Sequence, residues 1–351
     1  MNDQGRNGAE GMETVKKIGV GVVGVGNMGL RHAKIYSQLE GVELLGLCDI
    51  NEESLYAAKK VLGGKVFCST SLTEFLGRND IDAISICLPD NNHYESMMAA
   101  VGARKHILLE KPLADNYEQA RRIAAGIEGY DRKVSVAHLL RFDPRYSGAY
   151  AALRRNEVGQ VVYARCRRAS VITGPRYYRG ASTLPFHLAV HDIDLLNWFI
   201  GSEVQTVRSM SARRALDDLG VDDCVLTLLE YENGVIAQME HSWIMPELYP
   251  PTLDSRMDII GVDGMIELDL RSQGLSIFTD GKAEVVNTSY FFERHDGGIS
   301  GCLIEQIRSF IGAIANDTKV AVTVDEGLKA VEIAEAIAKS ARENTDVVLA
   351  N

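Results

Sequence analysis

The stretch VGVVGVGNMG, residues 20–29, decides the fold of this chain. An apolar run leads into three glycines spaced G-x-G-x-x-G, and a helical pattern follows them. In a strand–turn–helix unit the first glycine makes the tight turn, the second lets the backbone approach a pyrophosphate, and the third permits close helix–strand packing. The free N–H groups at the helix start then face the phosphates. The residues that we expect to contact a dinucleotide here are Gly24, Gly26, Asn27, Met28 and Gly29.

An acid at the end of the next apolar run supports this interpretation. Asp49 follows Val42–Cys48 and stands 20 residues beyond Gly29, where a carboxylate accepts hydrogen bonds from a ribose diol. No arginine follows it to hold a 2′-phosphate, which the negative charge of Asp49 would repel, so NAD is favoured over NADP. Arg31 or Lys34 could still help to bind NADP. A ligand-free glycine turn and a methyltransferase with a similar turn and acid are the alternatives.

Short apolar runs alternate with helical patterns through the first part of the chain. Alternation of buried strands with helices predicts an α/β domain of the Rossmann type, with a doubly wound parallel sheet. We assign it to residues 16–140, after a polar lead-in at residues 1–15 that we expect to be disordered. The expected strands are 18–23, 42–48, 83–88, 106–109 and 134–137, and the expected helices are 28–39, 52–62, 94–101 and 116–127.

The pattern changes in residues 141–351, the predicted second domain. Two-residue alternation of apolar and polar side chains, with a hairpin signal at Asn233-Gly234, predicts antiparallel strands. We expect an α+β domain for substrate binding and oligomerisation, in which helices cover one face of a large, open, mostly antiparallel sheet. The expected strands are 161–171, 203–212, 223–231, 235–242, 256–261, 265–270 and 275–278, and the expected helices are 145–155, 303–315 and 325–343.

The composition indicates in which compartment the protein works and which classes of partner it does not bind. Among 351 residues, 37 are basic and 48 acidic, and the net charge of −11 disfavours nucleic acids and anionic membranes. No apolar run is long enough to cross a bilayer, and the N-terminal residues lack the apolar segment of a signal peptide. The six cysteines form no C-x-x-C pair, which is typical of reduced thiols. We therefore expect a cytoplasmic protein that binds neither nucleic acid nor membrane.

A lysine stands where the predicted strand 106–109 ends, in the sequence HILLEKPLADN (residues 106–116). Ligands of doubly wound sheets lie at the carboxyl ends of the strands. Lys111 should therefore project into the crevice where a nicotinamide would lie. The alternative is an exposed loop lysine.

Five segments together resemble the glucose–fructose oxidoreductase/inositol dehydrogenase (Gfo/Idh/MocA) family. They are VGVGNMG (23–29), CDI (48–50), LPDNNHYE (88–95), LLEKPLA (108–114) and RFDPRY (141–146). The resemblance implies NAD(P)-linked oxidation or reduction of a sugar, cyclitol or related carbonyl compound. It implies that Lys111, beside Glu110, contacts both the cofactor ribose and the reacting hydroxyl. It also places near the nicotinamide the residues Pro89, Asn91, Asn92 and His93.

Two histidines four residues apart in FHLAVHDID (186–194) should share one helix face. The family commonly carries D-x-x-x-H-x-x-D here, so the resemblance makes His191 the general base and Asp194 the following acid. His187 stands where many relatives carry Asp, and a histidine cannot supply that negative charge, so it is a candidate for substrate binding instead. A zinc pair is the alternative, but a hydride-transfer site of this family needs no metal, and we predict none.

A basic segment, RCRRASVITGPRYYRGAST (165–183), precedes the histidines. Arg176 or Arg179 could hold a phosphate or carboxylate of the substrate, which would favour a nucleotide sugar or sugar acid over a neutral cyclitol. A solvated strand face and loop are the alternative. Arg141 could contact the ligands or form a structural ion pair.

These residues define a reaction. Oxidation of a secondary alcohol removes a proton, which a base such as His191 accepts, and a nearby cation such as Lys111 stabilises the alkoxide. We predict hydride transfer between a secondary hydroxyl or ketone of a sugar, nucleotide sugar or cyclitol and NAD(P). A non-catalytic dinucleotide sensor and a reductase of a non-sugar carbonyl or imine are the alternatives. The open sheet predicts a homodimer or homotetramer.

Overall fold

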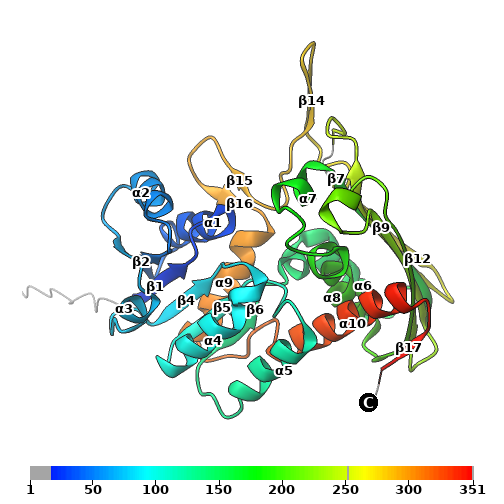
Figure 1. Cartoon of the computed structure of the whole chain (residues 1–351), viewed down its shortest axis with the longest axis horizontal. Coiled ribbons are helices and arrows are strands. Elements are labelled where there is room, and N and C mark those ends of the chain that lie inside the picture. The colour runs from blue at the N-terminus through cyan, green and yellow to red at the C-terminus, as the bar shows by residue number, and fades with distance from the viewer. Residues whose placement is uncertain (1–16, 251–252, 350–351) are drawn as a thin grey trace, which may run out of the picture.

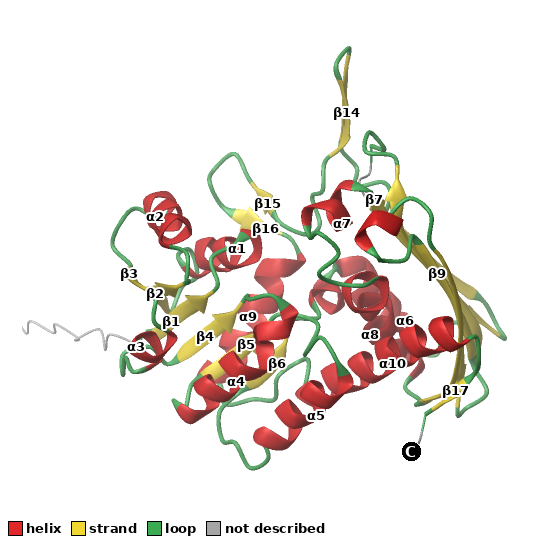
Figure 2. Ribbon diagram, in the orientation of Figure 1, coloured by secondary structure: helices red, strands yellow, loops and turns green. Residues whose placement is uncertain are grey.

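The computed structural model of the protein describes residues 17–250 and 253–349, which form two adjoining domains (Figures 1 and 2). The predicted disordered lead-in at residues 1–15 lies outside the described residues. The predicted boundary at residues 140 and 141 falls in a short helical turn, η2 (Leu139–Phe142). No described helix is both long enough and apolar enough to cross a membrane.

The first domain contains, in the described residues, a parallel sheet of six strands in the order β3-β2-β1-β4-β5-β6. This is the order of a Rossmann domain, and the predicted fold is confirmed. The strands are β1 (Ile18–Val23), β2 (Val42–Cys48), β3 (Phe67–Ser69), β4 (Ala83–Ile86), β5 (His106–Leu109) and β6 (Val134–Val136). The helices are α1 (Asn27–Tyr36), α2 (Glu52–Val61), α3 (Leu72–Leu76), η1 (Asp90–Asn92), α4 (His93–Gly102) and α5 (Tyr117–Gly126).

Side chains from these strands enter separate hydrophobic cores on the two faces of the sheet, because successive strand residues point to opposite sides. Val22 of β1 packs in one core, and Ile86 of β4 packs in the other. Helix α9 (Cys302–Ala315) comes from near the end of the chain, yet it buries Ile307 and Phe310 in the same core as Val22. A segment from the second half of the sequence therefore completes the first domain, as Figure 1 shows by colour.

The second domain is built on a sheet of seven described strands in the order β12-β11-β7-β10-β9-β8-β17. Only β7 and β10 pair in parallel within this sheet as described, so it is mostly antiparallel as predicted. Its strands are β7 (Val161–Val171), β8 (Val204–Ala212), β9 (Cys224–Tyr231), β10 (Ile236–Met245), β11 (Leu253–Gly261), β12 (Met265–Asp269) and β17 (Val347–Val348). Two small ribbons pair β13 (Ser276–Thr279) with β14 (Lys282–Val285) and β15 (Phe292–Glu293) with β16 (Ile299–Ser300).

Helices cover one face of the large sheet and leave the other bare (Figure 2). Along β9 the inward side chains Val225 and Leu229 are buried, whereas Leu226 and Leu228 are 51% and 57% exposed. The covering helices include α8 (Val190–Ile200), which carries His191, and α10 (Val324–Glu343), which also contacts α5 of the first domain. The remaining helical elements are α6 (Pro144–Arg154), α7 (Thr173–Tyr177), η3 (Pro185–Ala189) and η4 (Asp217–Leu219).

The glycine turn between β1 and α1 is constrained at its two ends and open in the middle. Gly24 has a φ of +82°, which L-residues rarely adopt. A Cβ on Gly29 would lie 1.8 Å from the carbonyl oxygen of Gly24, so α1 packs directly on the turn. A Cβ on Gly26 would meet nothing within 4 Å. Folding therefore needs glycine at positions 24 and 29, but not at position 26.

Gly29→Ala and Gly26→Ala form a matched pair that tests this constraint. We expect Gly29→Ala to destabilise the protein by about 3 kcal/mol or more, because the clash is with backbone that cannot move aside. Gly26→Ala should cost less than about 1 kcal/mol, the loss of a preferred N-cap residue. Urea unfolding followed by circular dichroism measures both, and equal losses would contradict the packing described for this turn.

Candidate active site

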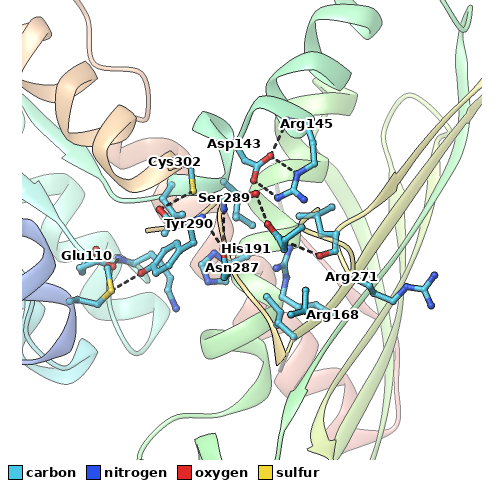
Figure 3. Close-up of a pocket in the computed structure, with 18 of the residues that line it drawn as sticks. Glu110, Asp143, Arg145, Arg168, His191, Arg271, Asn287, Ser289, Tyr290 and Cys302 are labelled. Carbon is cyan, nitrogen blue, oxygen red and sulfur yellow. Dashed lines mark hydrogen bonds and ion pairs between the residues drawn. The ribbon is translucent and has the colours of Figure 1, made fainter. Parts of the chain in front are cut away.

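A cavity of about 330 Å³ lies where the two domains meet. The first domain contributes Met28, Glu110 and Lys111, and the second contributes His191 from α8. Figure 3 shows His191 among side chains that converge from several elements on this space. Other lining residues are Leu139, Asp143, Arg145, Arg168, Tyr178, Arg271, Gln273, Asn287, Ser289, Tyr290 and Cys302. The predicted base and the predicted lysine, 80 residues apart in sequence, therefore line the same cavity.

The phosphate cradle is open at the start of α1. Gly26 and Asn27 are exposed, the N-cap residue makes no side-chain hydrogen bond, and the first turn carries no acid. A pyrophosphate would therefore meet backbone N–H groups rather than a competing side chain. The space left by the absent Cβ of Gly26 fits this role.

Asp49 lies beside the cradle, where the sequence placed it. Its Oδ2 accepts the Val25 N–H at 2.8 Å, and its Oδ1 accepts the Asn51 N–H at 2.9 Å. These bonds fix the carboxylate, and each oxygen keeps a further lone pair that a ribose hydroxyl could use. The residues therefore fit a dinucleotide.

Lys111 crosses the domain boundary. Its Nζ donates a hydrogen bond of 3.1 Å to the backbone carbonyl of His187. Burial lowers the pKa of Lys111, while the charges of Glu110 and Asp90 oppose this shift. The ammonium group is thus held by a neutral oxygen.

His191 lies on α8, which the chain enters through the π-helical turn η3. Such turns are frequent at functional sites. Burial, and then the positive charges of Lys111 and Arg168, hold the pKa of His191 well below its usual value. Its Nδ1 is buried and has no hydrogen-bond partner in residues 17–250 and 253–349. A neutral imidazole at this place can accept a proton.

His187 has a different environment from His191. Its ring lies 5.0 Å from the ring of Tyr178 and 5.9 Å from that of Trp243, measured between centroids. Burial, followed by the charge of Lys111, lowers the pKa of His187 to about 3. Its carbonyl contacts Lys111, and its side chain is not among those that line the cavity. Substrate binding by the His187 ring stays a prediction.

Asp194 is engaged away from the cavity. It accepts two hydrogen bonds from Arg141, at 2.6 and 2.9 Å, and both side chains are buried. Arg141 also binds Glu326 of α10 at 2.6 Å. The geometry favours the structural ion pair for Arg141, and it leaves Asp194 little freedom to contact a substrate.

The segment predicted to lie near the nicotinamide, residues 88–95, contains both buried and exposed residues. His93 is buried, with Nδ1 at 2.8 Å from the Pro112 carbonyl and Nε2 at 3.0 Å from the Leu88 carbonyl. Its ring therefore ties the start of α4 to the loop that carries Lys111. Pro89, Asn91 and Asn92 lie at the end of β4 and are at least partly exposed, where a ligand could reach them.

The two arginines predicted to hold an anion lie outside the cavity lining. Arg176 forms an exposed ion pair with Asp218 at 3.0 Å, and Arg179 is exposed with a φ of +51°. Three other arginines line the cavity instead, and each is paired with a carboxylate. The pairs are Arg145–Asp143, Arg168–Asp192 and Arg271–Asp269.

The pair Arg168–Asp192 was not predicted, because its partners come from β7 and α8. Asp192 accepts two hydrogen bonds from Arg168 and one from His241 Nε2 at 2.9 Å. Burial alone would raise the pKa of Asp192, but Arg168 outweighs burial and the pKa falls to about 2.

Cys166, Asp192 and His241 are close enough to share a metal ion, but the guanidinium of Arg168 already occupies the Asp192 carboxylate. The zinc interpretation of His187 and His191 gains no support from this cluster.

A loop from the second domain crosses the start of α1. Tyr290 Oη lies 2.7 Å from Met28 Sδ, and the Arg31 guanidinium packs 5.1 Å from the centre of the Tyr290 ring. Farther along, Lys34 pairs with Glu293 at 2.5 Å. Lys34 is therefore paired with a carboxylate, whereas Arg31 packs on an aromatic ring, a contact that orients the guanidinium without neutralising its charge. No sequence motif marks this loop.

Comparisons with known proteins agree with this fold. Residues 18–138 match a model described as oxidoreductase family, NAD-binding Rossmann fold, and residues 151–349 match the C-terminal alpha/beta domain of that family. The chain is 24% identical to the myo-inositol 2-dehydrogenase of Thermotoga maritima and 25% identical to the inositol 2-dehydrogenase of Rhizobium meliloti, over 94% of this chain and 98% of each relative. The crystal structure of scyllo-inositol dehydrogenase from Lactobacillus casei with bound NAD(H) and scyllo-inositol aligns with a TM-score of 0.82 and 22% identity, over 95% of this chain and 99% of that one. The matched models describe oxidoreductases and not methyltransferases, and this chain belongs to the Gfo/Idh/MocA oxidoreductase family, with an NAD-binding Rossmann domain.

Proposed function

We propose that the protein is an NAD-dependent dehydrogenase that oxidises a secondary hydroxyl of a cyclitol or sugar. The observation that carries the proposal is that Lys111 and His191 line one cavity beside an open phosphate cradle. The inositol dehydrogenases among the relatives support the substrate class.

The two side chains divide the proton chemistry between them. His191 is neutral and buried, so it can take the hydroxyl proton when a substrate lies in the cavity. Lys111 is cationic and stabilises the negative charge that develops on the same oxygen. NAD, when bound, supplies the hydride acceptor. In the reverse direction His191 returns the proton to the carbonyl oxygen.

The cavity favours a neutral polyol over the anionic substrate considered from the sequence. Its arginines are neutralised by their aspartate partners, which leaves Lys111 as the lining cation without an ion pair in the described residues. Gln273, Asn287 and Ser289 contribute polar groups from the loop near β13 and β14. Such groups recognise several hydroxyls at once.

NAD is the coenzyme that we propose over NADP. The fixed carboxylate of Asp49 would repel a 2′-phosphate, and Lys34, one of the two nearby cations, is paired with Glu293. We also retain a cytoplasmic location, because all six cysteines lie in the described residues and are unpaired.

A second copy of this chain is the partner that we propose for the bare face of the large sheet. The exposed apolar side chains Met210, Leu226, Leu228 and Ile236 lie on adjacent strands. Surfaces of this kind are uncommon on monomers. The ion pair of Arg165 and Asp258 lies on the same face and gives it both a positive and a negative charge. Two copies of this face, related by a two-fold axis, can therefore pair opposite charges with each other.

The substrate proposal is tested by a panel of myo-inositol, scyllo-inositol, neutral hexoses and hexuronates, with NADH formation followed by its absorbance. We expect turnover with at least one cyclitol or neutral sugar, and a kcat/KM at least about tenfold higher with NAD than with NADP, a difference of ~1.4 kcal/mol. A preference for hexuronates would contradict the neutral-polyol interpretation. Binding of NAD without any turnover would favour the alternative that the protein is a non-catalytic dinucleotide sensor.

Replacement of Lys111 by Met and of His191 by Asn tests their roles. Each change should lower kcat by about 10²- to 10⁴-fold, the usual contribution of a positioned acid–base or charge-stabilising group. Arg155→Ala is the control, because Arg155 is exposed and pairs only with Glu157 in the described residues. Normal kcat in either site variant would remove that residue from the mechanism.

Light scattering coupled to gel filtration tests the dimer. We expect the mass of two or four chains for the wild type, and of smaller assemblies for Leu226→Asp/Leu228→Asp, because buried charges would oppose association. Val61→Asp, at an exposed apolar position on α2, should leave the mass unchanged. A monomeric wild type would refute the proposed interface.

A further inference from the structure

A chain of buried polar groups connects the helix of the phosphate cradle to the lysine loop. His32 lies on α1, and its Nδ1 is 3.0 Å from Ser85 Oγ of β4. The same oxygen lies 2.8 Å from Tyr36 Oη. On its other side, His32 Nε2 lies 3.2 Å from Glu110 Oε1. His32, Ser85 and Tyr36 are at most 1% exposed, so water does not compete for these contacts.

The order of donors along this chain can be assigned from the Glu110 end, because a carboxylate accepts hydrogen bonds and does not donate them. We therefore place the ring proton of His32 on Nε2, which faces Glu110 Oε1. His32 Nδ1 then accepts from the Ser85 hydroxyl, whose oxygen accepts from the Tyr36 phenol. His32 Nε2 and Glu110 Oε1 lie within ion-pair distance without meeting hydrogen-bond geometry, and neither atom has a hydrogen-bond partner elsewhere in the described part of the chain.

Glu110 needs such a restraint because it is next to Lys111. Its Oε2 accepts the Lys111 backbone N–H at 3.3 Å, and the residue also lines the cavity. A carboxylate that rotated into the cavity would compete with the His187 carbonyl and with a substrate oxygen for the ammonium group. Holding Glu110 back keeps Lys111 available.

We propose that His32 is a positioning residue, which holds the Glu110 carboxylate on the α1 side so that the Lys111 ammonium stays on the His187 carbonyl and free for the substrate hydroxyl. This inference rests on the proposed function for the role of Lys111. It adds a physical link between the helix that receives the phosphates and the group that stabilises the alkoxide.

Two amide substitutions at one position separate the two contacts of His32. In His32→Gln the new side-chain amide nitrogen replaces Nε2 and can reach Glu110, whereas the shorter side chain in His32→Asn reaches only toward Ser85. We expect His32→Gln to keep kcat within about threefold and His32→Asn to lower it about 10- to 100-fold, as for a displaced catalytic group. The dissociation constant for NAD should change little in both. Tyr36→Phe is the control for a general loss of packing, because it removes a buried hydroxyl of the same chain and leaves the Glu110 contact intact.

A double-mutant cycle and crystal structures complete the test. Adding Glu110→Gln to His32→Asn should cause no further loss of kcat, since both changes disturb the same contact. In His32→Asn, Lys111 Nζ should no longer lie within hydrogen-bond distance of the His187 carbonyl. Equal kcat for the two His32 variants, or an unmoved Glu110 and Lys111 in His32→Asn, would overturn the inference. The proposed function is tested separately. Loss of activity in Lys111→Met would support it, and an inactive wild type would refute it. In either case the crystal structures would decide the role of His32.

Discussion

The site depends on one hydrogen bond between the domains, from the Lys111 ammonium to the His187 carbonyl. A carbonyl oxygen is a neutral partner, so it orients the ammonium without cancelling its charge. The same charge then helps to keep His191 unprotonated. One contact therefore places the cation and prepares the base, and the docking of α8 against the first domain sets the distance between them.

Around this contact, the protein keeps most of its other charges paired. Asp194 is held by Arg141, and Asp192 by Arg168, in environments where an unpaired carboxylate would be costly. These pairs fix α8 against its neighbours, and thereby fix the backbone that carries His187 and His191.

The sequence predicts those features that depend on local order. The glycine turn, Asp49 and Lys111 follow strand ends directly, so a one-dimensional pattern locates them. Arg168 with Asp192, or Tyr290 with Met28, come together only through tertiary packing, and no spacing rule reveals them. Arg176 illustrates the opposite case: it is near the histidines in sequence, but it pairs with Asp218 on the surface and does not line the cavity. Strand β3 has only three residues, too few for a periodic signal.

The return of α9 to the first domain has a consequence for biosynthesis. When residue 140 leaves the ribosome, the Rossmann sheet can pair its strands, but the core that contains Val22 still lacks Ile307 and Phe310. That face must stay uncovered while six of the seven described strands of the second sheet are being translated. The nascent chain thus exposes a hydrophobic surface over more than 160 residues of synthesis, which makes it a natural client for chaperones.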